Sequence, residues 1–207
     1  TMQRKLTLWA RLKPEIKANF EKEYADRPHS RAAMVEELDN EYYFTEIKYS
    51  VVHWVLAYND IDFSFGGIGA AKDLRVLKLS ETQVSSLDGV GQAISLYELH
   101  LTGVNVGGQI PDELFNLVKL RRLYMNYNRY TGHLSSKIGQ LVNLQRLYLM
   151  SNDLTGQLPA SIGELKEMQI LTLSENYFVG TIPNSINNMQ NLQTFAIQGE
   201  GSTFDQS

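Results

Sequence analysis

The sequence predicts an α/β solenoid with a parallel sheet along one face, and three observations support this fold class. A motif of 24 residues recurs from Leu96, Leu120, Leu144 and Met168. Each copy begins with apolar residues in alternate positions, as expected for a strand with one buried face. Each copy continues through a glycine to a second group of apolar residues near its end. A fixed repeat of about 20–50 residues is typical of solenoids.

The residue that follows each strand is expected to turn the chain. Asparagine occupies this place in three successive units, at Asn128, Asn152 and Asn176. An asparagine amide can bond backbone groups of adjacent coils, so these residues are expected to form a structural ladder. Thr82 and Val104 stand in the same place in the two preceding units. The ladder is therefore expected to begin only at Asn128.

Glycine recurs in the middle of each regular unit, where a side chain would obstruct a tight bend. Proline stands three residues further on in most units, and its fixed φ suits the opening of the convex side. In the unit from Leu120, Ser135 replaces proline. The glycines and prolines of the pattern are Gly108, Gly132, Gly156, Gly180, Pro111, Pro159 and Pro183.

The beginning of the chain does not follow the repeat and is expected to cover the end of the solenoid as a helical cap. Pro14 suits the first turn of one helix, and Ser30 suits the N-cap of a second. The spacing Tyr58-x-x-Ile61-x-Phe63 predicts the strand of a shortened first coil. The expected division is a helical N-terminal capping region in residues 1–57 and a solenoid in 58–207, with irregular coils in 58–95, regular repeats in 96–191 and a truncated last coil in 192–207.

The full unit reads L-x-x-L-x-L-x-x-N-x-L-x-G-x-I-P-x-x-L-G-x-L-x-x and resembles the plant-type leucine-rich repeat. The resemblance covers roughly Tyr58 to Gln198 and implies a right-handed superhelix with a concave parallel sheet. The family includes receptor-kinase ectodomains and wall-associated inhibitors of plants, and similar repeats occur in surface proteins of diatoms and Bacteroidetes-type bacteria. It implies a binding surface on an extracellular or cell-surface protein, without identifying the ligand.

Two absences in the sequence bear on its source. The chain has no cysteine, which excludes disulfides and thiolate sites within it, and it has no Asn-x-Ser/Thr acceptor. Extracellular plant members of the family commonly close both solenoid ends with cysteine pairs. Both absences therefore favour a bacterial source or a cytoplasmic protein. For a bacterial source, the resemblance implies a surface protein such as a lipoprotein. The net charge of -4 gives no footprint for nucleic acid, and no apolar run approaches the ~18 residues of a transmembrane segment.

The sequence contains no recognisable catalytic or metal-binding motif. Its histidines, His29, His53, His100 and His133, are far apart and lack the spacing of zinc hydrolases. No nucleophile can be matched to a base, and the carboxylates are scattered rather than paired. We therefore predict no enzymatic activity, no cofactor and no bound metal.

The expected binding surface is the outward face of the concave sheet, where equivalent residues should lie about 4.8 Å apart. In the middle coils this spacing brings Tyr124 and Tyr148 beside Arg122 and Arg146. Tyrosine and arginine are enriched at binding hot spots, because they combine contact area with directed hydrogen bonds. The candidate ligand-binding residues are Glu98, His100, Arg121, Arg122, Tyr124, Asn126, Tyr127, Arg146, Tyr148 and Met150.

The role of this patch has more than one interpretation. It could recognise an acidic or aromatic peptide, a protein loop, or a sugar stacked on tyrosine. Alternatively, the tyrosines and arginines pack on each other only to solubilise the sheet. The leading hypothesis is a non-catalytic module that binds a protein or peptide on the concave face. The alternatives are a carbohydrate-binding accessory protein for nutrient capture, a scaffold or adhesin segment whose ends join further repeats, and a substrate-recognition domain with its catalytic partner elsewhere.

Overall fold

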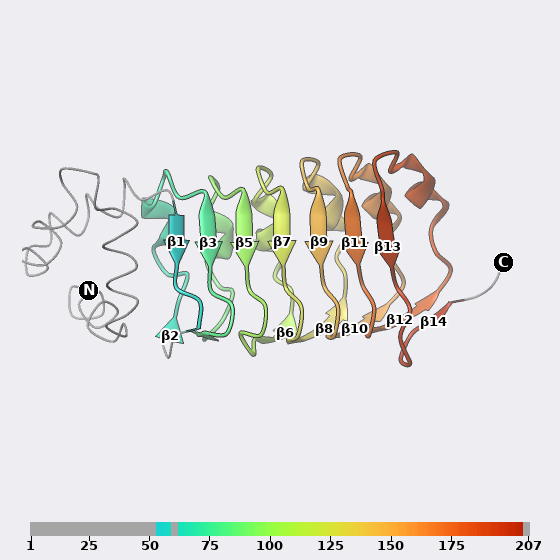
Figure 1. Cartoon of the computed structure of the whole chain (residues 1–207), viewed down its shortest axis with the longest axis horizontal. Coiled ribbons are helices and arrows are strands. Elements are labelled where there is room, and N and C mark those ends of the chain that lie inside the picture. Colours follow the sequence, from blue (N-terminus) through green and yellow to red (C-terminus); the bar gives the residue numbers. More distant parts are fainter. Residues whose placement is uncertain (1–52, 59–61, 205–207) are drawn as a thin grey trace, which may run out of the picture.

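The computed structural model describes residues 53–58 and 62–204 as a row of stacked coils (Figure 1). Each coil contributes one strand to a seven-stranded parallel sheet, called the main sheet below. The predicted parallel solenoid is confirmed. In spatial order, the strands of the main sheet are β1 (His53–Val55), β3 (Val76–Lys78), β5 (Glu98–His100), β7 (Arg122–Tyr124), β9 (Arg146–Tyr148), β11 (Ile170–Thr172) and β13 (Thr194–Ala196).

The period of the sequence sets the register of the main sheet. From β5 to β13, each residue pairs with its equivalent 24 positions later, as Leu123 pairs with Leu147. The middle residue of each strand points inward, and its two neighbours point outward. The inward residues from β3 to β11 are at most 1% exposed: Leu77, Leu99, Leu123, Leu147 and Leu171.

A second parallel sheet, which the sequence analysis did not predict, runs along the side of the solenoid. Tyr130, Leu154 and Phe178 anchor it in the core, each with 0% exposure. The strands are β6 (Gly107–Gln109), β8 (Arg129–His133), β10 (Asp153–Gly156), β12 (Tyr177–Gly180) and β14 (Thr203–Phe204), with β2 (Asp62–Phe63) and β4 (Gln83–Val84) paired separately. The strands β6, β8, β10 and β12 each contain glycine, which is disfavoured in strands, so the sequence did not indicate strands here.

The side opposite the main sheet consists of short 3-10 helices. Pro111, Pro159 and Pro183 each stand at a helix N-cap with φ between -69 and -65°. Ser135, which replaces proline, is the N-cap of η4, and its Oγ accepts a hydrogen bond from the backbone N–H of Lys137 at 3.3 Å. The helices are η1 (Ile68–Ala70), η2 (Val90–Gln92), η3 (Asp112–Asn116), η4 (Ser136–Gln140), η5 (Ala160–Glu164) and η6 (Asn184–Asn188). In the described part of the chain, no helix is long and apolar enough to cross a membrane.

The first coil differs from the sequence-based prediction. Its strand in the main sheet is β1, which begins at His53, and not the segment from Tyr58 to Phe63. Tyr58 is 73% exposed at a left-handed turn with φ of 60°, whereas Phe63 belongs to β2. The error arose because this segment reproduces the apolar spacing of a strand by chance. The two expected helices of the cap lie outside the described residues.

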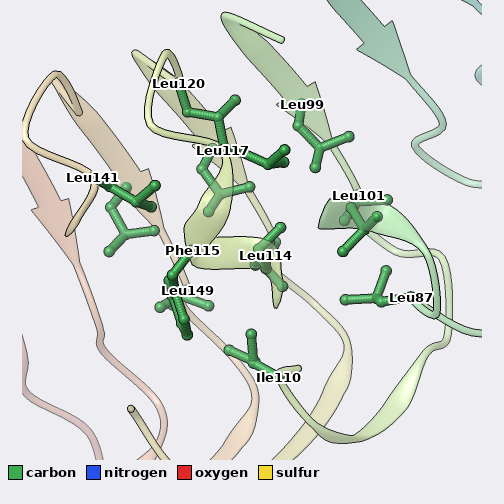
Figure 2. Packing of buried hydrophobic residues seen from close by; sticks show 14 of the residues in the cluster. Leu87, Leu99, Leu101, Ile110, Leu114, Phe115, Leu117, Leu120, Leu141 and Leu149 are labelled. Carbon is green, nitrogen blue, oxygen red and sulfur yellow. The ribbon is translucent and has the colours of Figure 1, made fainter. Parts of the chain in front are cut away.

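A continuous apolar core fills the space between the sheets and the 3-10 helices. Figure 2 shows side chains of successive coils packed together in this core, including Leu99, Leu114 and Leu149. Burying one such leucine contributes roughly 1.5–3 kcal/mol. Tyr130 is also fully buried, and burial raises the pKa of its hydroxyl. The repeated apolar positions therefore stabilise each coil mainly through its neighbours.

Asn152 joins its coil to the preceding one. Within its own coil, its Nδ2 donates to the carbonyl oxygens of Leu149 and Met150 at 3.0 and 3.3 Å. In the preceding coil, Nδ2 donates to the carbonyl oxygen of Met125 at 3.0 Å, and Oδ1 accepts from the N–H of Tyr130 at 3.2 Å. These bonds satisfy backbone groups that the turn after each strand leaves unpaired. Asn176 forms the equivalent bonds one coil later.

The ladder is incomplete at its first member. Asn128 Nδ2 donates to the Leu101 carbonyl oxygen at 2.6 Å, but its buried Oδ1 has no hydrogen-bond partner among the described residues. By the same offset of 22 residues, its missing donor would be the N–H of Val106, in the unit that has Val104 in place of asparagine. In the place of an asparagine, the Thr82 hydroxyl donates to the Leu79 carbonyl oxygen of its own coil at 2.5 Å.

We predict that Asn152→Ala lowers the free energy of unfolding by about 2–4 kcal/mol, because it leaves buried backbone groups without partners. Asn128→Ala should cost less, because its Oδ1 bonds nothing among the described residues. Urea unfolding of the full chain measures both values. The exposed Asn143 bonds one carbonyl oxygen, that of Val118, so Asn143→Ala is the control and should cost about 1 kcal/mol or less. Equal losses for Asn128 and Asn152 would contradict the inferred role of Oδ1.

Glycine in the 3-10 helices allows neighbouring coils to approach closely. A Cβ added at Gly163 would lie 2.3 Å from the backbone oxygen of Ser185, and one at Gly139 would lie 2.8 Å from that of Ser161. Both distances are too short for a real Cβ. The coils are also joined here by the hydroxyl of Ser185, which donates to the Ala160 carbonyl oxygen at 2.6 Å.

We predict that Gly163→Ala lowers the thermal midpoint, because the Cβ forces η5 and η6 apart at a cost of roughly 1–3 kcal/mol. Gly66→Ala is the matched control, since the nearest atom to its Cβ would be Ser64 Oγ at 3.5 Å. Thermal unfolding followed by circular dichroism compares the two variants. If both melt like the wild type, close packing of the 3-10 helices does not limit stability.

Candidate functional site

The outward face of the main sheet carries two columns of side chains, because outward residues of neighbouring strands are in register. One column is mainly charged in its first half, and the other contains three stacked rings. They are named the charged column and the aromatic column. The charged column is Val76, Glu98, Arg122, Arg146, Ile170 and Thr194, and the aromatic column is Lys78, His100, Tyr124, Tyr148, Thr172 and Ala196.

Glu98 is the centre of an ion-pair cluster at the beginning of these columns. Its Oε1 lies 2.5 Å from His100 Nε2 and 3.8 Å from Lys78 Nζ. Its Oε2 accepts a hydrogen bond from Arg122 NH1 at 2.8 Å. The carboxylate is largely covered, with 15% of its side chain exposed, whereas Arg122 is 45% exposed. Glu98 is therefore occupied by residues of its own chain and is not free to bind a ligand.

The pKa values of this cluster follow from its geometry. Burial alone raises the pKa of Glu98, but the hydrogen bonds from His100 and Arg122 and the nearby positive charges bring it below its ordinary value of 4.5. Burial lowers the pKa of His100 below 6.5, and the Glu98 carboxylate only partly opposes this shift. His100 is then neutral at pH 7, and its Nε2–H donates to Glu98. Bonding to Glu98 also raises the pKa of Arg122.

Three rings form a continuous stack in the aromatic column. The ring centroids of His100 and Tyr124 are 4.1 Å apart with an interplanar angle of 21°, and those of Tyr124 and Tyr148 are 4.8 Å apart at 7°. The second spacing matches the distance between neighbouring strands. The rings are half-buried because they cover one another. Burial raises the pKa of the Tyr124 hydroxyl, and a hydrogen bond with Arg146 partly opposes this shift.

Arg146 forms a hydrogen bond with the Tyr124 hydroxyl, but its charge is not compensated by a carboxylate. It lies in register with Arg122 and therefore next to a like charge. Among the described residues, no carboxylate lies within ion-pair distance of Arg146, whereas Arg122 is paired with Glu98. On its other side, Arg146 is in register with Ile170. The guanidinium is thus available for an anionic group from outside the solenoid.

A third column, which the sequence analysis did not single out, precedes the strands. The ring of Tyr97 lies between two guanidinium groups, with Arg121 CZ at 5.3 Å and Arg75 CZ at 5.8 Å from its centroid. These distances are within the range of cation–π interactions. Arg121 was predicted as a site residue, but Tyr97 and Arg75 were not. All three stand one residue before a strand, so counting that position along the repeat would have found them.

The remaining predicted residues lie where the chain leaves the strands. Asn126 Oδ1 accepts a hydrogen bond from the backbone N–H of Met150 at 2.8 Å, so its carbonyl joins two coils. Tyr127 has a φ of 56°, and its side chain is 57% exposed at the turn. The structure therefore gathers six predicted residues on β5, β7 and β9, with Arg121 before them and Asn126, Tyr127 and Met150 at the turns. In the described part of the chain, no group of His, Asp and Glu could hold a metal ion.

The family of the chain follows from comparison with known proteins. A family model described as a leucine-rich repeat region matches residues 99–203, which is just over half of the chain. The chain belongs to the leucine-rich repeat family, and its repeats are of the plant type. A search of curated protein sequences gives no match.

Solved structures of plant receptors share this fold. The receptor chain in the PEPR1–AtPEP1 structure is 30% identical to this chain, with a TM-score of 0.68. The match covers 75% of this chain and 24% of the receptor chain. The TDR receptor is 25% identical to this chain, with a TM-score of 0.70. The match covers 77% of this chain and 28% of the receptor chain. Arabidopsis HAESA was solved in complex with the peptide hormone IDA and the co-receptor SERK1. It is 28% identical to this chain, with a TM-score of 0.66, and the match covers 71% of this chain and 26% of HAESA. The chain thus spans about a quarter of the length of these receptors.

We predict that acidification destabilises the fold through the Glu98 cluster. The folded pKa of His100 lies below 6.5, so the unfolded chain binds this proton at higher pH. Stability is therefore lost as the pH falls from 6.5 through the lowered folded pKa. Glu98 acts in the same direction at lower pH, because its ion pairs are lost as the pH falls through its own lowered pKa.

The variant His100→Phe keeps a ring in the stack and removes the titrating group. Its thermal midpoint should change less than that of the wild type between about pH 7 and pH 5. Glu98→Gln removes the carboxylate and should flatten the profile at lower pH. Parallel profiles for the wild type and both variants would exclude this cluster as the source of acid sensitivity.

Proposed function

We propose that this chain is a non-catalytic recognition module that binds an acidic peptide segment of a partner on the outward face of the main sheet. The uncompensated Arg146 beside the ring stack is the observation on which the proposal rests. An arginine can hold a carboxylate through two parallel hydrogen bonds. The adjacent rings of Tyr124 and Tyr148 provide contact area with little loss of side-chain freedom.

The charge distribution supports an acidic partner. The charged column, the aromatic column and the column before the strands together carry five cations and one carboxylate, Glu98. The whole chain, by contrast, has a net charge of -4. Positive charge is therefore concentrated on this face, where it can attract and orient a negatively charged segment. The five cations are Arg75, Lys78, Arg121, Arg122 and Arg146.

The solved relatives support a peptide as the ligand class. HAESA is in complex with a peptide hormone and a co-receptor, and RGFR1, a plant peptide hormone receptor, is in complex with RGF2. A binding role of this kind also suits an extracellular or cell-surface protein. The bacterial source expected from the missing cysteines stays a prediction.

The test is to select binders to the full chain from a displayed peptide library and to titrate the enriched peptides against variants. Arg146→Ala should weaken their binding about tenfold or more, because it removes the carboxylate partner at the centre of the patch. Raising the salt concentration should weaken binding to the wild type in the same direction.

Arg129→Ala is the matched control, because Arg129 is an exposed arginine on β8 of the second parallel sheet, away from the main sheet. It removes the same charge from the chain and should leave peptide binding within about twofold of the wild type. Equal losses for Arg129→Ala and Arg146→Ala would show only a general charge effect. Binding that is insensitive to Arg146→Ala would place the peptide elsewhere and refute the proposal.

A further inference from the structure

We propose that the face of Tyr148 directed toward β11 is a subsite for an aromatic side chain of the peptide partner. This subsite rests on the proposed function, because it lies within the same recognition surface. The inference specifies the partner further: an aromatic residue stands close to the acidic group that pairs with Arg146.

The ring stack has one occupied end and one open end. At the first end, Lys78 is the next residue of the column and lies 3.8 Å from Glu98, within the ion-pair cluster. At the other end, the positions after Tyr148 are held by Thr172 and Ala196. These side chains are too short to cover a phenol ring, and no ring contact of Tyr148 other than that with Tyr124 occurs among the described residues.

The spacing of the sheet suits another ring at this position. Tyr124 and Tyr148 are nearly parallel at 4.8 Å because their strands are neighbours in one parallel sheet. A ring placed above Thr172 would lie at the same distance from Tyr148, one strand further along. This distance is within the range of about 4.5–7 Å in which aromatic pairs attract one another. Among the described residues no aromatic side chain follows Tyr148 in this column, so a fourth ring would come from the partner.

The surroundings of the open end favour an uncharged, flat group. Ile170 lies beside Thr172 on β11 and presents an apolar surface, and Thr194 and Ala196 follow on β13. The outward positions of these two strands carry no charge. Arg146 is the neighbour of Ile170 in the charged column. Its guanidinium can therefore hold a carboxylate that stands next to the bound ring in the partner.

The test uses two variants that close or remove the open face. Thr172→Phe places a ring of the chain itself beside Tyr148, on an outward strand position that accepts aromatic residues well. Tyr148→Leu removes the ring and keeps an apolar side chain. Lys78→Phe is the matched control, because it adds the same side chain at the other end of the same column and leaves the Tyr148 face open.

The probes are peptides enriched on the wild-type full chain, each compared with a version in which its aromatic residue is replaced by leucine. On the wild type and on Lys78→Phe, this replacement should weaken binding about three- to tenfold. On Thr172→Phe and Tyr148→Leu, it should have no effect, because the surface on which the ring stacks is blocked or absent. Circular dichroism confirms that each variant is folded before its affinity is measured.

Two outcomes overturn the subsite while leaving the proposed function intact. One is that peptides sensitive to Arg146→Ala contain no aromatic residue. The other is that the replacement by leucine costs the same on the wild type, Thr172→Phe and Tyr148→Leu. By contrast, peptides that bind equally to the wild type and Arg146→Ala refute the proposed function itself.

Discussion

The hydrogen bonds between the asparagine ladder and the preceding coil fix the register of the regular part of the solenoid. Asn152 and Asn176 each bond backbone groups of two coils, so a coil cannot shift without leaving buried polar groups unpaired. The close approach of η5 and η6 at Gly163 constrains the opposite side in the same way. Together these contacts hold equivalent residues at the spacing of neighbouring parallel strands.

The properties of the outward face follow from this register. A stack of rings forms because two tyrosines and a histidine occupy the same place in consecutive units. Two arginines become neighbours for the same reason, but only Arg122 has a carboxylate in register on its free side. Arg146 has Ile170 instead. The uneven charge within the charged column therefore arises from the residues that occupy one position of the repeat in turn: Glu98, two arginines and an isoleucine.

Much of the fold could be predicted from the sequence because the repeat reports the inward leucines, the turn asparagines and the prolines directly. The columns of outward residues followed from the same period. The second sheet could not be predicted, since Gly132 and Gly156 have positive φ and lie in strands that composition does not favour. The first strand was misplaced, because the segment from Tyr58 to Phe63 has the apolar spacing of a strand. The pairing of β1 with β3 shows that the strand lies at His53–Val55 instead.

The candidate site could be located from the sequence, but the division of roles among its residues could not. Spacing along the chain places Arg122 next to Glu98 and Arg146 one strand further away, without showing that Arg122 and Glu98 form an ion pair. Formation of that ion pair depends on side-chain conformation. It makes Arg122 a structural partner of Glu98 and leaves Arg146 without a carboxylate. Asn126 is a similar case, since its Oδ1 is used by the Met150 N–H. The Arg146 guanidinium, which has no carboxylate partner among the described residues, and the face of Tyr148 toward β11 lie on the same strand and can therefore act together on one segment of a partner.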